Sequence, residues 1–292
     1  MSTNVTQSTN NFPEFLYRYR SNSTRYACQD LKQAIGFRRV YFSSLLGQND
    51  PFDCNPSFKS SSAQEIVDYF KKHRPGKLIV EEKTVSKLFP KISSPGERRR
   101  IRRAYRPTLA NIERVMQTGE ALLQEQRRKA FICCFSESWD SPLMWSHYSN
   151  SHRGYCIKYR VREDLMQKFD DRFPLDVKYS SKRPKLTMID LLKFADGVKG
   201  KVGNYSQNEV LLALAYQKPD EWKYEKEWRA HSLSDPRPGY KPLSALEPVE
   251  VILGANSDDR IPDFIRRRVD ERIPISKVNL SSQNYSICLK PV

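Results

Sequence analysis

The chain has 292 residues, and its 50 Lys and Arg against 34 Asp and Glu give a formal net charge of +16. With 38% hydrophobic and 11% aromatic residues it can bury a sizeable core, which excludes collagen-like, low-complexity and wholly disordered chains. No apolar run approaches the roughly 20 residues that a membrane span needs. The polar residues 1–12 do not resemble a secretory signal. We therefore expect a disordered tail over 1–12, a cytoplasmic location and no membrane partner.

The six cysteines and four histidines show no metal-binding spacing. Because no CxxC pair is present, we expect mostly buried, reduced thiols and no metal site. Cys133 and Cys134 lie in FICCF, where consecutive side chains of a strand point to opposite faces. A hard cation and nuclease chemistry remain an alternative, although turn formation explains most of the carboxylates concerned, which are Asp50, Asp53, Glu137 and Asp140.

Residues 13–60 predict strand, helix, strand and loop in that order. The strands, 15–19 and 39–44, are short, aromatic and β-branched, and ACQDLKQAIGF between them has helical spacing. The loop LGQNDPFDCNP carries turn-forming residues. We expect Phe52 in its middle to fold down onto the core.

Residues 62–129 predict a helical, basic insertion. Ser94 to Glu97 form a helix start with Pro in the first turn and a capping-box Glu. The block RRRIRR at 98–103 is the densest positive cluster in the chain. It indicates either a phosphate-binding surface or a solvated helix face, formed by Arg98, Arg99, Arg100, Arg102 and Arg103.

The rest of the chain mixes strands and helices without βαβ regularity, which favours an α+β fold with a largely antiparallel sheet. We expect one domain over 13–292, interrupted by the insertion. Its strands are predicted at 131–136, 154–159, 174–179, 226–233, 249–254 and 284–290, and its helices at 142–148, 163–170, 186–197, 206–217 and 259–272.

Two segments place ionisable groups among apolar residues. If WKYEKEWRAH is a strand, Glu225, Glu227, Arg229 and His231 share one face, either as the wet side of a sheet or as a site. In MWSHYSNSHRG, His147 lies beside aromatic residues, which suits ring stacking with a ligand base or a structural hydrogen bond. No nucleophile triad and no glycine-rich phosphate loop is recognisable.

Five blocks, in order, resemble a bacterial family known as domain of unknown function 2971. They match its LYKYR-like start, its FS…NDPFDC loop, its CFSE segment, its MW.HY…H.G.C stretch and its YE.EWR stretch. In this chain the blocks are LYRYR at 16–20, YFSSLLGQNDPFDC at 41–54, CFSE at 134–137, MWSHYSNSHRGYC at 144–156 and WKYEKEWRAH at 222–231.

The plan also resembles a diverged ADP-ribosyltransferase fold, whose split antiparallel sheet holds nicotinamide adenine dinucleotide (NAD). That resemblance implies a nucleotide contact from the first strand, which is Arg18 here. It implies a second-strand group on the nicotinamide side, Ser43 or Ser44, with Tyr148 as the alternative. The late-strand catalytic Glu would be Glu227. The chain lacks the Ser-Thr-Ser triplet of that superfamily, and Glu225 competes for the catalytic role.

These residue types suit the chemistry that the resemblance implies. Cleavage of the bond between ribose and nicotinamide develops positive charge on the sugar, which a carboxylate such as Glu227 stabilises. Arg18 and Arg20 share one strand face and could hold the pyrophosphate. Trp145 or Tyr148 could stack on nicotinamide or adenine.

We therefore expect an enzyme that uses NAD as a substrate and modifies nucleic acid or protein. The resemblance implies a toxin or defence effector, with an inhibitory antitoxin as a further partner. The alternative is a non-catalytic nucleic-acid-binding module that grips phosphates through the RRRIRR block.

The enzyme assignment predicts two results that can be tested. Arg18 and Glu227 must converge on one cleft, and it fails if they lie on opposite sides of the sheet or more than about 15 Å apart. Glu227→Gln should lower turnover by about two to four orders of magnitude with little loss of stability, whereas Glu225→Gln should cost much less.

Overall fold

The computed structural model describes residues 12–22, 27–59, 61, 65, 68–69, 72, 121, 123–168, 173–190, 213–232, 235 and 237–292. The chain divides into two compact units, which we call unit 1 (1–44, 130–179 and 220–292) and unit 2 (45–129 and 180–219). The tail 1–11 and most of the predicted insertion 62–129 lie outside the described residues, and so does the whole arginine block at 98–103.

Unit 1 is built on a sheet in the order β11-β2-β4-β1-β5-β12-β13-β14, with β10 pairing with β4 and β6. All of its pairings are antiparallel except that of β12 with β13. This confirms the α+β class with a largely antiparallel sheet. The strands are β1 (Phe15–Arg20), β2 (Arg39–Ser44), β4 (Phe131–Ser136), β5 (Tyr155–Val161), β6 (Leu175–Asp176), β10 (Glu227–Ser232), β11 (Gly239–Pro242), β12 (Leu246–Leu253), β13 (Ile275–Leu280) and β14 (Ile287–Pro291).

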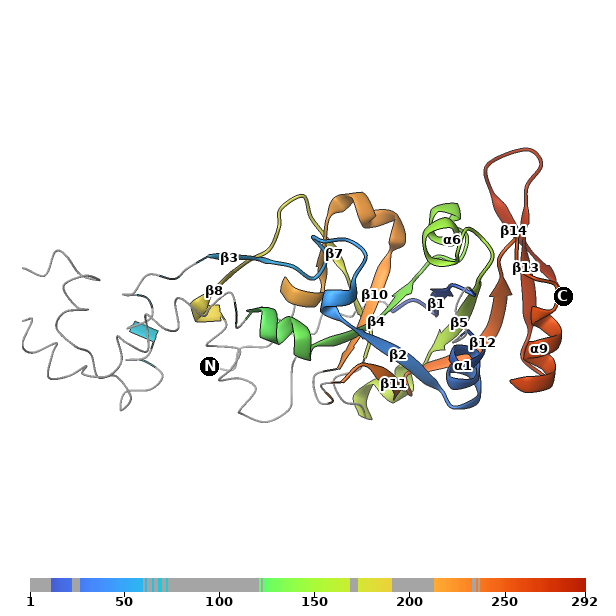
Figure 1. Ribbon diagram of the computed structural model, residues 1–292, viewed down its shortest axis with the longest axis horizontal. Helices are drawn as coiled ribbons and strands as arrows, with labels where there is room; N and C mark the ends of the chain where they lie inside the picture. Colours follow the sequence, from blue (N-terminus) through green and yellow to red (C-terminus); the bar gives the residue numbers. More distant parts are fainter. Residues whose placement is uncertain are drawn as a thin grey trace, which may run out of the picture. The chain divides into compact units, whose positions relative to one another are not determined.

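Helices lie on both faces of the sheet. Helix α1 (Ala27–Leu31) continues into a π-helical turn (Lys32–Gly36) on one side of β1, and α6 (Pro142–Tyr148) lies on the other side (Figure 1). Alternation along the strands gives each face its own core, since successive side chains point in opposite directions.

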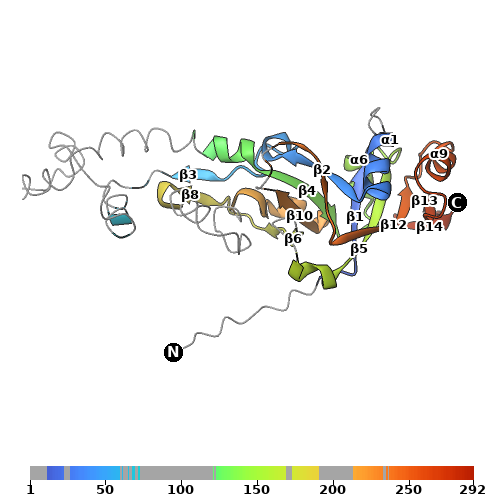
Figure 2. The same cartoon turned by 90° about the horizontal axis from the view of Figure 1, so that it is seen from below.

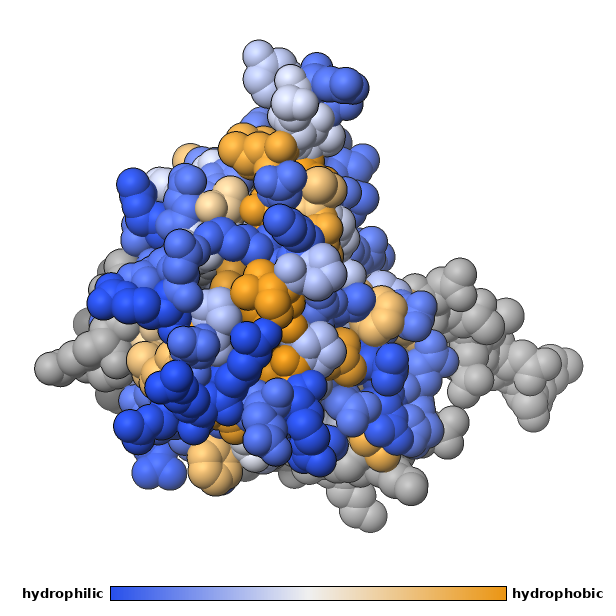
Figure 3. Space-filling model, turned by 90° about the vertical axis from the view of Figure 1, so that its right-hand side faces the viewer, coloured by the Kyte–Doolittle hydropathy of each residue, from blue (hydrophilic) through white to orange (hydrophobic). Residues whose placement is uncertain are grey.

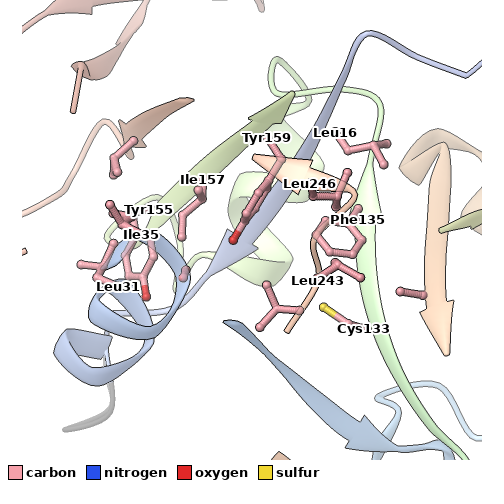
Figure 4. Packing of buried hydrophobic residues seen from close by; sticks show 14 of the residues in the cluster. Leu16, Leu31, Ile35, Cys133, Phe135, Tyr155, Ile157, Tyr159, Leu243 and Leu246 are labelled. Carbon is pink, nitrogen blue, oxygen red and sulfur yellow. The ribbon is translucent and has the colours of Figure 1, made fainter. Parts of the chain in front are cut away.

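The core on the α1 face contains Leu16, Phe135, Tyr155 and Tyr159, all nearly inaccessible to solvent. Figure 4 shows Tyr155 beside Leu31 and Ile35 of the helical segment, and Tyr159 close to Leu246. The core on the α6 face is mainly aromatic and contains Tyr17, Tyr19, Met144, Trp145, Cys156, Ile252 and Val278. Tyr17 and Tyr19 of β1 thus pack into this core.

Helix α9 (Ile261–Arg268) follows β12 and lies beside β13 and β14 (Figure 2). Its Ile265 is fully buried, whereas three arginines end the helix, Arg266, Arg267 and Arg268. The side of unit 1 that carries α9 is mainly hydrophilic, with apolar side chains visible near its centre (Figure 3). These three arginines are exposed and provide a control for charge variants in unit 2.

In unit 2, the 3-10 turn Leu45–Gly47 precedes β3 (Ser57–Lys59), which pairs in parallel with β8 (Lys185–Thr187). The loop between this 3-10 turn and β3 contains Phe52. The expectation that the Phe52 ring folds onto the core is wrong. Phe52 is 60% exposed, and the guanidinium of Arg183 lies 5.6 Å from its ring centroid. A cation over the ring replaces apolar packing there.

Several predicted elements differ in detail. The predicted strand 174–179 is divided into β6 and β7 (Lys178–Tyr179), and the predicted helix 163–170 is a 3-10 helix over Glu163–Lys168. The predicted helix 186–197 overlaps β8, and its part beyond 190 lies outside the described residues. Five strands were not predicted, namely β3, β8, β9 (Gln217–Lys218), β11 and β13. Four of them have two to four residues, and β13 carries Ser, Lys and Asn.

Candidate functional site

Arg18 and Arg20 extend from β1 on the α1 face, where both form ion pairs with a single buried carboxylate. Asp30 of α1 is 1% exposed, and its Oδ2 accepts from Arg20 Nε at 3.0 Å and from the Tyr155 hydroxyl at 3.0 Å. Arg18 Nη1 lies 3.8 Å from Asp30 Oδ1, and Arg18 Nη2 donates to the Tyr41 carbonyl at 3.0 Å. Burial and the charge of Asp30 raise the pKa of Tyr155 well above its usual value. The two arginines are thus tied into an internal network that links β1, α1 and β5.

Glu227 projects from the opposite face of the same sheet. In the ladder, Tyr17 of β1 and Glu227 of β10 are both paired with Ser136 of β4, so these three side chains share one face. Arg18 follows Tyr17 in a regular strand and therefore points to the other face. The predicted convergence of Arg18 and Glu227 on one cleft is therefore wrong, and these two residues do not form one dinucleotide site.

Glu227 is held by a buried guanidinium. Arg229 is fully buried, and its Nε and Nη2 donate to the two carboxylate oxygens of Glu227 at 2.8 Å each. Cys134 lies on the same face, and burial, together with the charge of Glu227, raises the pKa of its thiol well above the usual value. The prediction that Glu227, Arg229 and His231 share one face is consistent with the alternation of β10, but all three are buried, so this is not the wet side of a sheet.

Glu225 lies in a 3-10 helix, not in the strand. That helix, η5, spans Asp220–Glu225, and Lys226 with φ 43° turns the chain before β10 begins. Glu225 is only 2% exposed, so it is buried like Glu227. Tyr148, the last residue of α6, donates its hydroxyl hydrogen to Glu225 Oε1 at 2.6 Å. Ser136 Oγ donates to the Glu225 carbonyl at 2.6 Å and so anchors the end of the turn to β4.

The N-terminus of helix α6, which carries Tyr148 at its other end, is defined by sequence. Ser141 caps the N-terminus by accepting from the Met144 amide, and Pro142 occupies the first turn. Trp145 is fully buried, and its Nε1 donates to the Trp139 carbonyl at 2.7 Å. The ring is therefore unavailable for stacking on a ligand, which corrects the role predicted for Trp145.

Aromatic rings surround the Tyr148–Glu225 pair on the surface. His147 is exposed, and its ring centroid lies 6.4 Å from that of Trp222 in η5. Trp222 in turn lies 6.1 Å from Tyr224. We call Tyr148, Glu225, His147, Trp222 and Tyr224 the α6–η5 cluster. It combines a buried carboxylate with partly exposed rings.

The two serines of β2 fall on different faces. Ser43 is paired with Ile132 and Ser44 with Phe131, so Ser43 shares the face of Glu227 and Ser44 that of Arg18. Ser43 Oγ donates to the Ile132 carbonyl at 3.5 Å. The structure therefore does not bring the two serines to one dinucleotide together.

A pocket of about 400 Å³ opens beside the Asp30 network, with Cys28, Tyr155, Arg260 and Phe264 among its lining residues. None of the residues predicted to bind NAD lines it.

The carboxylates considered for a hard cation have other partners: Asp53 contacts Lys218, Asp50 accepts from the Phe52 amide, Glu137 accepts from Trp228, and Asp140 from Ser138. Within the described residues no cluster suits a metal ion, and no helix is long and apolar enough to cross a membrane.

Sequence reasoning missed Asp30 and the contact of Tyr148 with Glu225. A signal for Asp30 was present, because it lies three residues after Ala27 and four before the buried Ala34, within the apolar stripe of its helix. Glu225 gave no such signal, since strand alternation does not hold across a 3-10 helix and a turn with positive φ.

Comparisons with curated proteins and with solved structures found no match. Residues 144–230, which run from α6 to β10 and so include both ends of the α6–η5 cluster, match the model of a family described as a protein of unknown function, DUF2971. Over this segment the match supports the family that the five sequence blocks resemble.

Proposed function

We propose that this protein binds nucleic acid and that unit 2 supplies the electrostatic contact. The supporting observation is the division of charge between the units. The sequence of unit 2 holds 25 Lys and Arg against 13 Asp and Glu, a net +12 of the chain's +16. Unit 1, although longer, holds 25 against 21. A polyanion is attracted to the unit with the larger excess.

Part of the positive charge of unit 1 is already paired with carboxylates. Many arginines and lysines in its described part face a carboxylate, as in Arg162 with Asp164, Arg260 with Asp258 and Lys277 with Asp259. A cation that already pairs with a carboxylate must give up that contact to neutralise a phosphate, so it contributes less to the release of the counterions condensed on the nucleic acid.

A pair of triple variants tests the proposal. Arg98→Ala, Arg99→Ala and Arg100→Ala remove three charges from the arginine block of unit 2, and Arg266→Ala, Arg267→Ala and Arg268→Ala remove three from α9 of unit 1. Affinity for a fluorescent oligonucleotide is measured over a series of salt concentrations. The unit 2 variant should flatten the log-log slope by up to about three, and the α9 variant by much less. Equal effects, or no binding by the parent protein, would overturn the proposal.

The α6–η5 cluster supports a second candidate, NAD-dependent ADP-ribosyl transfer with a revised site. Tyr148 orients a buried carboxylate at 2.6 Å beside the His147 and Trp222 rings, and such an arrangement suits a planar base next to a sugar that develops positive charge. In this candidate Glu225 replaces Glu227, and Arg18 takes no part. The acceptor would be nucleic acid held by unit 2 or a protein, and a toxin or defence role and an inhibitory partner follow only from this chemistry.

Release of nicotinamide from NAD tests this candidate. If it is right, Glu225→Gln should lower the rate by about two to four orders of magnitude, because it removes the charge that faces the sugar. Tyr148→Phe should lower it by a smaller factor, since it removes only one hydrogen bond to that carboxylate. A parent protein that releases no nicotinamide with any nucleic acid or protein acceptor would eliminate the candidate while leaving nucleic-acid binding untouched.

A further inference from the structure

One guanidinium in unit 2 is buried without a full set of partners. Arg127, in the helical residues 123–129, is 8% exposed. Its Nη1 donates to Gln124 Oε1 at 3.0 Å, but its Nε has no hydrogen-bond partner. Within the part of the chain that the structure describes, no carboxylate lies in ion-pair range of it. Burial is the largest influence on its pKa and lowers it.

A buried carboxylate of unit 2, Asp53, already serves other groups. Asp53 is buried, and its Oδ2 lies 3.5 Å from Nζ of the equally buried Lys218. Its Oδ1 accepts from the Cys54 thiol at 3.4 Å. Cys54, whose φ is 53°, is also close enough to Arg127 to influence it electrostatically. The loop thus brings Asp53 near Lys218, and among the described residues of unit 2 no carboxylate pairs with Arg127.

A second cation lies near Arg127. The positive charge of Arg183 acts to lower the pKa of Arg127, as a neighbouring like charge does. Arg183 is itself held in place, because its Nε donates to the Asn55 carbonyl at 2.7 Å and its guanidinium lies over the Phe52 ring. Arg127 is thus a buried cation whose Nε lacks a partner, and burial of an unpaired charge is unfavourable unless an anion joins it.

We propose that Arg127 anchors a phosphate-binding site in unit 2, with Arg183 as the second cation. The edge of a guanidinium that carries Nε–H and Nη2–H offers two parallel donors, which match two oxygens of one phosphate group. On Arg127 this edge includes the donor that lacks a partner. The ligand class is a phosphate monoester or diester, either free or within a nucleic-acid backbone. The inference deepens the proposed function and rests on it only where the phosphate belongs to a nucleic-acid backbone.

The test uses the full chain, labelled with ¹⁵N so that arginine Nε–H signals are observed by NMR. The Arg127 signal is assigned by its loss in Arg127→Lys. Inorganic phosphate is titrated at constant ionic strength against chloride, and a short single-stranded oligonucleotide is titrated separately. We expect phosphate to shift the Arg127 Nε–H signal in a saturable way and chloride not to shift it.

Two substitutions and one control complete the experiment. Arg127→Met and Arg127→Lys should each weaken phosphate binding at least tenfold, since a lysine keeps the charge but not the paired donors. Arg128→Met is the matched control, because the neighbouring Arg128 is 68% exposed and pairs with Glu125. If Arg127→Met does not fold, the NMR signal of the parent protein and the Lys variant still decide the question.

The outcomes separate the site from the proposed function. No shift of the Arg127 signal, or equal weakening by Arg128→Met, would overturn the site even if the protein binds nucleic acid. A saturable phosphate response that depends on Arg127, in a protein that does not bind the oligonucleotide, would support a site for free phosphate esters and overturn the proposed nucleic-acid function.

Discussion

The Glu227–Arg229 pair allows a prediction that runs against the expectation from sequence. The Arg229 side chain is 0% exposed and that of Glu227 6%, with two hydrogen bonds of 2.8 Å between them. Glu227→Gln keeps the shape but removes the negative charge, which leaves a buried guanidinium uncompensated. Loss of one partner of a buried pair costs about 3–5 kcal/mol. We therefore expect a large loss of stability where the sequence alone suggested little.

The magnitude converts into a measurable shift. For a unit of this size, about 1 kcal/mol corresponds to about 2–4 °C in Tm, so Glu227→Gln should lower Tm by about 6–20 °C. The assay is thermal unfolding followed by near-UV circular dichroism, which reports on the packing of tryptophans such as the buried Trp228 in the same strand.

A matched control exists elsewhere in unit 1. Asp258 and Arg260 have the same two-residue spacing, and Arg260 also reaches both carboxylate oxygens, but the Arg260 side chain is 89% exposed. Asp258→Asn should therefore lower Tm far less than Glu227→Gln. Adding Arg229→Met to Glu227→Gln should restore part of the loss, because no buried charge remains. A Tm for Glu227→Gln within about 2 °C of the parent would refute the reasoning.

Three further predictions follow from single contacts. Burial lowers the pKa of His152, so the folded state favours the neutral ring, and the free energy of unfolding should fall as pH drops through the unfolded pKa of about 6.5. His152→Asn tolerates the local φ of 64° and should reduce this pH dependence in urea unfolding between pH 7 and pH 5. Gly154→Ala places a Cβ 2.1 Å from the Arg20 carbonyl oxygen and should lower the free energy of unfolding, measured by chemical denaturation, by about 1–3 kcal/mol or more. At Gly36 a Cβ meets nothing within 4 Å, so Gly36→Ala should lower it far less. Equal losses would contradict this packing. Asp30→Asn should destabilise unit 1 by about 3–5 kcal/mol, because it leaves Arg18 and Arg20 without their carboxylate, and a Tm that does not change would show that the network is dispensable.

Much of the fold could be predicted because strand patterns are local. The strands 39–44 and 131–136 and the helix 142–148 have the bounds that the sequence predicted. Aromatic and β-branched runs and the Ser-Pro cap carry these elements within a few residues of chain. The boundary between Glu225 and Glu227 was missed because it depends on the positive φ of Lys226, which Lys does not signal.

The site was harder to predict, because it depends on which strands pair. The parity of each residue within its strand was right for Arg18 and Arg20, but the face of one strand relative to another follows from register. That Tyr17 and Glu227 share Ser136 as a partner is a long-range fact with no local trace in the sequence. Assigning roles from motif resemblance therefore placed Arg18 and Glu227 in one site, although they lie on opposite faces of the sheet.

The most direct test of nucleic-acid binding through unit 2 is a map of where nucleic acid touches the chain. The full-length protein is mixed with a photoreactive oligonucleotide near physiological salt, irradiated and digested, and the cross-linked peptides are identified by mass spectrometry. The account predicts cross-links concentrated in 45–129 and 180–219, with loss of most of them at high salt. Cross-links confined to 1–44, 130–179 and 220–292, or none above the level of a neutral control protein, would contradict it.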